Sequence, residues 1–213
     1  FALLASGCES DLEQLNATNR CVRCFLNESD LVGADLQGAN LTWSYLERAM
    51  LDDANLSGVN LNGARLSEAS LRRAVLWRAD IRKASLVRGV LDHADLREAN
   101  LSETDLSHAQ LTGARLDGAD LTAAVLRFAD LRGASLKAAN LQQADLTGAI
   151  LTTANLTSTN LRWAILAQAD LRATNLSHAK LINTNLSGSN LTGAMWVDAT
   201  HQCSNQSCDG KAY

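Results

Sequence analysis

Five cysteines are the residues of this 213-residue sequence whose type and spacing could most readily do chemistry. Cys21 and Cys24 form a Cys-x-x-Cys pair, Cys203 and Cys208 lie five positions apart near the end, and Cys8 precedes them all. Such cysteines form disulfides in an oxidising compartment or bind zinc. A zinc site needs a second pair of ligands, and none lies near Cys21 and Cys24 in the sequence. The spacing therefore favours disulfides at the two ends of the chain.

The odd number of cysteines leaves their pairing open. In one interpretation residues 4–8, LASGC, are a loose lipobox, Cys8 carries a lipid, and the others pair as 21–24 and 203–208. In the other, which we favour, Cys8 pairs with Cys21 or Cys24 and leaves one thiol free. Residues 1–7 are apolar but short, so they could belong to an export signal. A membrane association is expected only if Cys8 is lipidated.

The remaining polar residues suggest no reaction. The four histidines, His93, His108, His178 and His201, have no metal-ligand spacing to one another or to a cysteine. No nucleophile elbow, phosphate-binding loop or dinucleotide fingerprint is present in the sequence. The net charge of −4 gives no sign of a nucleic-acid binder. We therefore predict no catalytic residues, no metal and no cofactor, and we expect that the protein is not an enzyme.

Leucine recurs at every fifth position from Leu26 to Leu191, over 34 consecutive positions with Ile81 as the single exception. A small residue, mostly alanine, stands two positions before each leucine, and Asp or Asn often stands directly before it. A period of five fits neither the 3.6-residue turn of a helix nor the two-residue alternation of a strand. The chain must therefore turn once in every repeat, and each short extended piece points its leucine and its small residue to the same side.

Glycine and the acidic or amide residues predict where the turn lies. Ten of the 13 glycines stand two positions after the central leucine, which suggests backbone dihedral angles that favour glycine there. The Asp or Asn before the leucine is expected to bond to the turn backbone through its side chain.

This A-(D/N)-L-x-x pattern resembles the pentapeptide-repeat family, and the resemblance covers residues 24–200. It implies an all-β fold, a right-handed quadrilateral parallel β-helix in which four repeats close a coil of 20 residues. Thirty-four repeats then give about 8.5 coils. The interior should be filled by side chains and offer no pocket.

The ends of such a solenoid need caps. Ser10 to Glu13 match a capping box, so residues 1–23 are expected to form a short N-terminal α-helical cap. Residues 201–213 form a cysteine-containing tail, and Trp196 takes a leucine position where it can close the core. A helix followed by Cys-x-x-Cys at the first coil resembles exported pentapeptide-repeat proteins of the thylakoid lumen or periplasm of cyanobacteria and chloroplasts. A cytoplasmic location is the alternative.

Residues 20 positions apart should stack in columns on the surface. This places charges of opposite sign above one another, each pair contributing up to about 1 kcal/mol. The clearest predicted ion-pair column contains Asp52, Asp53, Arg72, Arg73 and Asp92, and further pairs are Arg48 with Glu68, Arg78 with Glu98, Arg97 with Asp117 and Lys83 with Glu103.

Four aromatic residues are interface candidates because they should point outward: Trp43, Trp77, Phe128 and Trp163. Phe25 and Tyr45 share one column near the cap and are expected to pack against it. Together these features favour a non-catalytic structural or protein-interaction module, with an unknown protein partner and a possible homodimer. The alternative is a cytosolic DNA-mimicking inhibitor of a type II topoisomerase, which the resemblance also allows.

Overall fold

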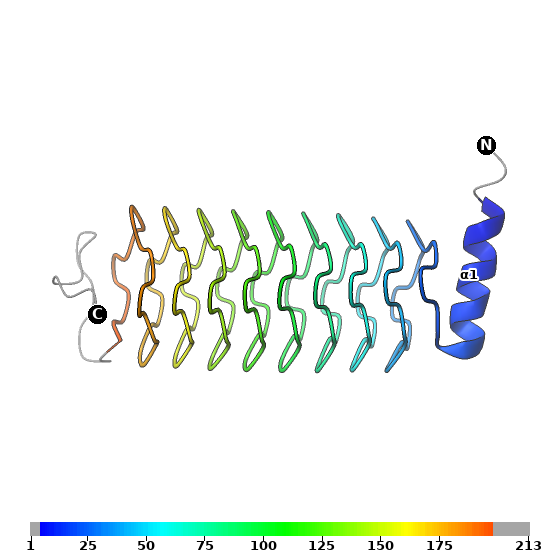
Figure 1. The fold of residues 1–213 in the computed structure, drawn as a ribbon, viewed down its shortest axis with the longest axis horizontal. Helices are drawn as coiled ribbons and strands as arrows, with labels where there is room; N and C mark the ends of the chain where they lie inside the picture. Colours follow the sequence, from blue (N-terminus) through cyan, green and yellow to red (C-terminus); the bar gives the residue numbers. More distant parts are fainter. Residues whose placement is uncertain (1–4, 198–213) are drawn as a thin grey trace.

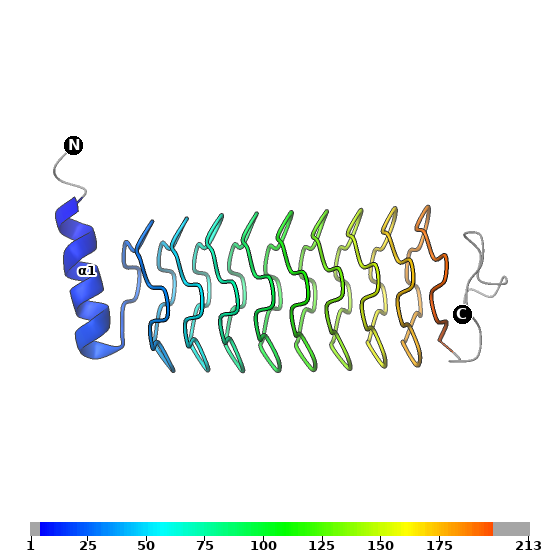
Figure 2. The same ribbon diagram turned by 180° about the vertical axis from the view of Figure 1, so that it is seen from behind.

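The computed structural model describes the backbone of residues 5–197 and the side chains of residues 11–197. One helix, α1 (Ala5–Thr18), lies across one end of a long rod of stacked coils (Figure 1). The view from behind shows the same regular stack along the whole rod (Figure 2). The N-terminal helix was predicted, but Ser10 lies inside it and does not begin it. Residues 5–9 contain no proline and the helix continues through Gly7 to begin at Ala5, so the capping-box prediction was wrong.

Parallel bridges join each residue that precedes a central leucine to the residue 20 positions later, from Arg20↔Asn40 to Asn175↔Met195. Four repeats therefore make one coil. The ladder begins at Arg20, before the predicted boundary at residue 24. In the described residues the pairing consists of isolated bridges, because a turn in every repeat leaves room for a single bridging residue between turns.

Every N–H group of a typical repeat has an acceptor, as repeat 56–60 illustrates. Two N–H groups donate to the following coil, one to the preceding coil, one closes the turn, and one reaches a side chain. The bonds are Leu56 to Val75 O (2.7 Å), Gly58 to Trp77 O (2.8 Å), Asn60 to Ala39 O (2.8 Å), Val59 to Leu56 O (3.1 Å) and Ser57 to Asn55 Oδ1 (3.2 Å). Buried backbone groups are costly when unpaired, so this pattern explains why five residues suffice for a stable repeat.

The residue two positions after the central leucine has a positive φ whether or not it is glycine. Gly58 has a φ of +63° and Ala138 a φ of +55°. With the bond from the small residue back to the leucine carbonyl, this geometry is that of a type II turn. The glycine prediction is confirmed and extended, since each turn imposes the same left-handed conformation on whatever residue stands there.

The core is a solid column of leucine and alanine. The central residues from Leu26 to Leu176 and the small residues from Ala39 to Ala169 are almost fully buried. Where the small residue is Thr, its hydroxyl donates to the carbonyl of the residue 23 positions earlier, as Thr104 does to Ile81 O at 2.8 Å. Each buried leucine contributes about 1.5–3 kcal/mol before chain entropy is counted.

Replacing Ala138 by glycine is expected to stabilise the rod by about 1 kcal/mol, because a side chain at positive φ is strained and glycine is not. The matched control is the neighbouring Ala139, which is buried at 1% exposure. Ala139→Gly removes a core methyl group and should destabilise by about 1–2 kcal/mol. Urea unfolding of both variants measures the difference, and shifts of the same sign would contradict the turn assignment.

Candidate interaction surface

The turn-forming side chains are the first feature of the surface. Asp or Asn before the central leucine accepts a hydrogen bond from the N–H two positions later, as Asp105 does from Ser107 at 2.9 Å. This confirms the predicted role of these residues in the turn. They are structural groups whose acceptor oxygens are already engaged by the backbone.

In four repeats the residue before the central leucine is neither Asp nor Asn, and a side chain from the preceding coil accepts the turn N–H bond instead. The N–H groups of Glu47, Arg72, Thr112 and Lys137 donate to Asn27, Asp52, Asp92 and Asp117, respectively. Asp52 and Asp92, which the sequence suggested as members of an ion-pair column, therefore also complete turns in the next coil. The five-residue consensus does not predict that the acceptor comes from another coil. Aligning the sequence in rows of 20 residues does, because it places each acceptor directly before its donor in the same column.

The predicted columns bring several opposite charges together. Arg73 donates to both carboxylate oxygens of Asp53, at 2.8 and 2.6 Å, and Arg72 lies 3.8 Å from Asp52. Arg78 pairs with Glu98 at 2.7 Å, and Lys83 lies 3.8 Å from Glu103. Arg48 lies between Glu28 at 3.2 Å and Glu68 at 3.8 Å.

A second set of ion pairs lies within single repeats and was not predicted from the sequence. In Asp-Leu-Arg or Asp-Ile-Arg segments both charged residues face outward across the buried residue. Their shortest ion-pair contacts join Asp80 to Arg82 (2.7 Å), Asp95 to Arg97 (2.5 Å), Asp130 to Arg132 (2.6 Å) and Asp170 to Arg172 (2.6 Å). Arg97 bonds to Asp95 in this way, although the sequence suggested Asp117 one coil later. The signal was available, because residues two apart on a strand share a face.

These pairs hold several carboxyl pKa values low. Hydrogen bonds from Arg97 lower the pKa of Asp95, although partial burial opposes the shift. Arg82 and Arg172 do the same for the pKa values of Asp80 and Asp170. A depressed native pKa contributes stability above the ordinary value near pH 4, and this contribution is lost as the pH falls through the native value.

Asp95 allows the charge and the turn bond to be separated. Asp95→Asn keeps an acceptor for the Arg97 N–H but removes the charge, so we expect a loss of up to about 1 kcal/mol. Asp95→Ala removes both and should cost about 1–2 kcal/mol. Thermal melts at neutral pH should therefore rank the stabilities as wild type, then Asp95→Asn, then Asp95→Ala. Between pH 4 and pH 2 the wild-type protein should lose more stability than Asp95→Asn, and identical acid sensitivity would contradict a role for the Asp95 charge.

The aromatic candidates are half-exposed, but most of them rest on neighbouring groups. Trp43 is 50% exposed, and its ring covers Gly63 so closely that an added Cβ there would lie 2.4 Å from it. Phe128 covers Gly148 in the same way and stacks on His108 at 5.2 Å.

Trp77 and Trp163 do not rest on a glycine in this way. The Arg78 guanidinium lies 4.3 Å from the centre of the Trp77 ring. Trp163 is 48% exposed, and Ile165 beside it in sequence is 38% exposed. Near the cap, Phe25 is 56% exposed and stacks on Tyr45 at 4.7 Å, while its N–H donates to Asp11 of α1 at 2.7 Å.

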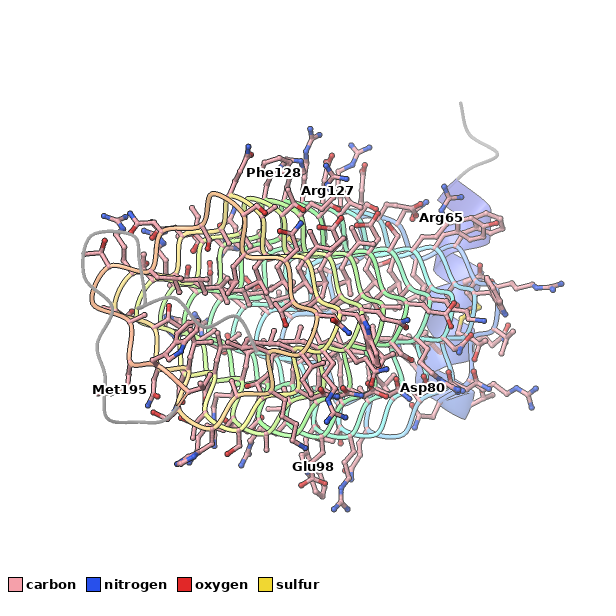
Figure 3. All side chains as sticks on the ribbon, turned by 60° about the vertical axis from the view of Figure 1, so that its left-hand side comes forward. Arg65, Asp80, Glu98, Arg127, Phe128 and Met195 are labelled. Atoms are coloured by element: carbon pink, nitrogen blue, oxygen red, sulfur yellow. A yellow bond between two sulfur atoms is a disulfide. The ribbon has the colours of Figure 1, made fainter. Side chains whose placement is uncertain are left out.

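One shallow groove of about 470 Å³ lies near the cap. It is lined by Arg23, Trp43, Tyr45, Gly63 and Arg65. Arg65 also pairs with Glu47 at 3.1 Å and lies over the Tyr45 ring. Figure 3 shows Arg65 toward the end of the rod that α1 covers, with Arg127 and Phe128 further along the same edge of the rod and Glu98 on the opposite edge. No five-residue pattern predicts this groove, because its lining comes from three coils.

The N-terminal cysteines lie inside the first coil beneath α1. Cys21 and Cys24 occupy a central and a small-residue position, with 0% and 4% exposure, and their sulfur atoms lie 2.04 Å apart. The structure thus pairs Cys21 with Cys24, and the favoured expectation that Cys8 bonds to one of them was wrong. The two positions flank a single turn and both face inward, so their sulfur atoms meet. The side chain of Cys8, and Cys203 and Cys208, lie outside the described residues.

Apolar side chains cover the core at both ends of the rod. Leu15 of α1 is buried, and Leu12 packs beside it against the core. Trp196 packs partly buried at the other end. Within the part of the chain that the structure describes, no three His, Cys, Asp or Glu side chains are placed to hold a metal ion, and no helix is both long and apolar enough to cross a membrane.

The comparisons with known proteins concern both sequence and fold. The Pentapeptide repeats family profile matches eight copies, over residues 20–49, 49–88, 89–118, 114–152 and 154–193. None of the curated proteins matches this chain.

Three solved structures illustrate the similarity. HetL, a pentapeptide repeat protein involved in heterocyst differentiation regulation in the cyanobacterium Nostoc sp. strain PCC 7120, is 31% identical over 90% of this chain and 98% of its own, with a TM-score of 0.36. A pentapeptide repeat protein from the Arabidopsis thaliana thylakoid lumen is 38% identical over 42% of this chain and 63% of its own, with a TM-score of 0.41. QnrB1, a plasmid-mediated fluoroquinolone resistance protein, is 21% identical over 82% and 92%, with a TM-score of 0.54, a likeness of fold alone. Since the family profile matches residues 20–152 and 154–193, most of the sequence, this chain belongs to the pentapeptide-repeat family.

Proposed function

We propose that this chain is a non-catalytic structural or protein-interaction module of an exported protein, built as a right-handed quadrilateral β-helix. The observation that carries the proposal is the solid interior. Leucine and alanine fill every coil from Leu26 to Leu171, so a substrate has no enclosed site, and binding must use the outer faces. A rod with long, regular faces suits contact with another protein along its length.

The Cys21–Cys24 disulfide supports export. Disulfides persist in oxidising compartments and are rare in the cytosol. This one is buried under the cap, where it can serve as a staple for the first coil. The thylakoid lumen or the periplasm is therefore the compartment in which we place the protein.

The first test is the intact mass of the protein from its natural host, measured without reduction. Two disulfides, Cys21–Cys24 and Cys203–Cys208, each remove two hydrogens, and a processed N-terminus would accompany export. Added acyl mass on Cys8 would make it a membrane-tethered exported protein. Five free thiols would refute the export proposal and leave a cytosolic protein.

The non-catalytic role has its own test. Cross-linking in the native compartment, followed by mass spectrometry, should join one reproducible partner protein to outward-facing residues of the rod. A turnover activity that is abolished by a single surface substitution without loss of folding would contradict the proposal.

Topoisomerase inhibition is the second candidate, and the ion pairs argue against it. A DNA mimic needs rows of free negative charge, but the carboxylates of Asp53, Asp80 and Asp95 each bond to an arginine. We expect no inhibition of gyrase supercoiling by the purified protein. Inhibition at micromolar concentration would revive this candidate and weaken the export proposal.

A further inference from the structure

The exposed aromatic side chains gather on one of the four sides of the rod. Bridges define this side by one column of residues: Phe25, Tyr45, Arg65, Ser85, Asp105, Val125, Asp145, Ile165 and Asn185. Trp43 and Trp163 stand on the corner just before this column, and Phe128 stands on the corner just after it. Within residues 11–197, five aromatic residues are more than a third exposed. Four of them lie on this side or its corners, and Trp77 is the exception. We call this side with its two corners the aromatic face.

Trp77 lies half a coil away, beside the opposite column that contains Val75 and Asp95. It is covered in part by Arg78. Trp163, in contrast, is followed one coil later by Asn183, so it has no glycine beneath it of the kind that seats Trp43 on Gly63. The uneven distribution of aromatic residues distinguishes the aromatic face from the other three sides, and such enrichment is typical of protein interfaces.

The charges of the aromatic face balance. Six positive side chains and six negative ones stand on its columns: Arg23, Arg48, Arg65, Lys83, Arg88 and Arg127, with Glu28, Glu47, Glu68, Glu103, Asp105 and Asp145. Most of them pair within the rod, including Arg65 with Glu47 at 3.1 Å and Arg127 with Asp145 at 3.7 Å. Because two copies carry the same charges, any net charge on the face would be doubled when the copies meet, so a face without net charge suits self-association better than a charged one. This favours a second copy of the chain over a strongly acidic or basic partner.

The positions of the aromatic residues also have a centre of symmetry along the rod. Trp43 and Trp163 stand three coils before and three coils after Glu103 on the same corner. A two-fold axis in the plane of the face, at the level of Glu103, places Trp43 of one copy opposite Trp163 of the other. The same axis places Tyr45 opposite Ile165 and Arg65 opposite Asp145.

The other corner obeys the same symmetry. Arg88 and Phe128 stand one coil before and one coil after His108, so the axis sets the guanidinium of one copy over the ring of the other. At the axis itself Glu103 and Asp105 each meet their own copies. Lys83 lies 3.8 Å from Glu103, and the Lys83 side chains of the two copies offset part of these like charges.

We infer that two copies of this chain associate side by side and antiparallel through the aromatic face. Eight coil spacings of about 4.8 Å and a width of roughly 15–20 Å give about 600–800 Å² for each copy. That is at or below the usual size for a stable interface, so the dimer should dissociate on dilution. The inference goes beyond the proposed function, which requires neither a dimer nor this face.

The test is the mass of the full chain in solution, by light scattering or sedimentation over a dilution series. Wild-type protein should pass from dimer to monomer, and Trp163→Arg should raise the dissociation constant at least tenfold. Trp77→Arg is the matched control, because it makes the same change at an exposed tryptophan on the opposite side and should leave the constant unchanged. Circular dichroism of both variants confirms that the rod is folded.

The orientation needs a separate measurement. Cross-linking of the wild-type dimer should join the region of Lys83 in one copy to the region of residues 120–127 in the other, which only antiparallel rods allow. A monomer at every concentration, a dimer that Trp77→Arg breaks, or cross-links between equal levels of parallel rods would each overturn the inference. A monomeric rod that binds a different protein would overturn it and leave the proposed function standing.

Discussion

Replacing Leu111 by aspartate is expected to unfold the coils around it. Leu111 is fully buried at the middle of the rod, between the central leucines of the coils before and after it. The substitution loses about 2–3 kcal/mol of apolar burial and places a carboxyl group where it has no hydrogen-bond partner. Burying such a group costs about 2–4 kcal/mol more, even if it becomes protonated. A total near 5 kcal/mol is a large part of the stability of a domain of this size.

Hydrogen exchange followed by mass spectrometry measures where this damage falls. In a solenoid each coil contacts only its neighbours, so protection should be lost first between residues 91 and 131. Leu186→Asp is the matched control. Leu186 is only partly buried in the last coil, so this substitution should lower the free energy of unfolding much less. Leu111→Met should cost less than about 1.5 kcal/mol. Unchanged cooperative melting of Leu111→Asp would refute the placement of this leucine in a closed core.

Replacing Gly63 by alanine is expected to destabilise the rod by about 2–3 kcal/mol. Gly63 has a φ of +67°, where an added side chain costs about 1 kcal/mol or more. The chain accepts this strain elsewhere, for instance at Ala138. The larger effect at Gly63 is steric, because the new Cβ would lie 2.4 Å from the ring of Trp43. The indole must leave its position, and its packing on the next coil is lost.

Gly33 is the matched control for this effect. It has nearly the same φ, +65°, but nothing lies within 4 Å of an added Cβ. Gly33→Ala should therefore lose only the backbone contribution, about 1 kcal/mol. Urea unfolding of the two variants isolates the contribution of Trp43, and tryptophan fluorescence should shift for Gly63→Ala alone. Equal losses at both positions would mean that Trp43 does not rest on Gly63.

Much of the surface could be predicted once the coil length was known. The pairs Arg73–Asp53 and Arg78–Glu98 follow from a spacing of 20 residues. The choice that Arg97 makes between Asp95 and Asp117 did not follow, since both acids lie within reach. The structure resolves it in favour of Asp95, because residues two apart across one buried leucine can form a close pair without spanning two coils.

The cysteines show the same limit at the N-terminus. Composition and spacing predicted end staples, but three cysteines near the cap allowed several pairings. Cys21 and Cys24 are bonded because the first turn points both inward, with Cα atoms 5.4 Å apart. The inward direction of both cysteines depends on where the first coil begins. The bridges begin at residue 20, whereas the leucine pattern predicted a start at residue 24.

The sequence by itself determined the period, the core and the turn, because each is a property of one five-residue unit repeated 34 times. Leucine, the small residue and Asp or Asn have the same roles in every repeat, so one correct interpretation applies to all. Only the tertiary structure decided between competing outer partners, since a surface side chain can reach residues 2, 18 or 20 positions away. The seating of Trp43 on Gly63, the replacement of a missing turn acceptor by Asp52, and the gathering of aromatic residues on one side all arise from stacking, which no single repeat contains.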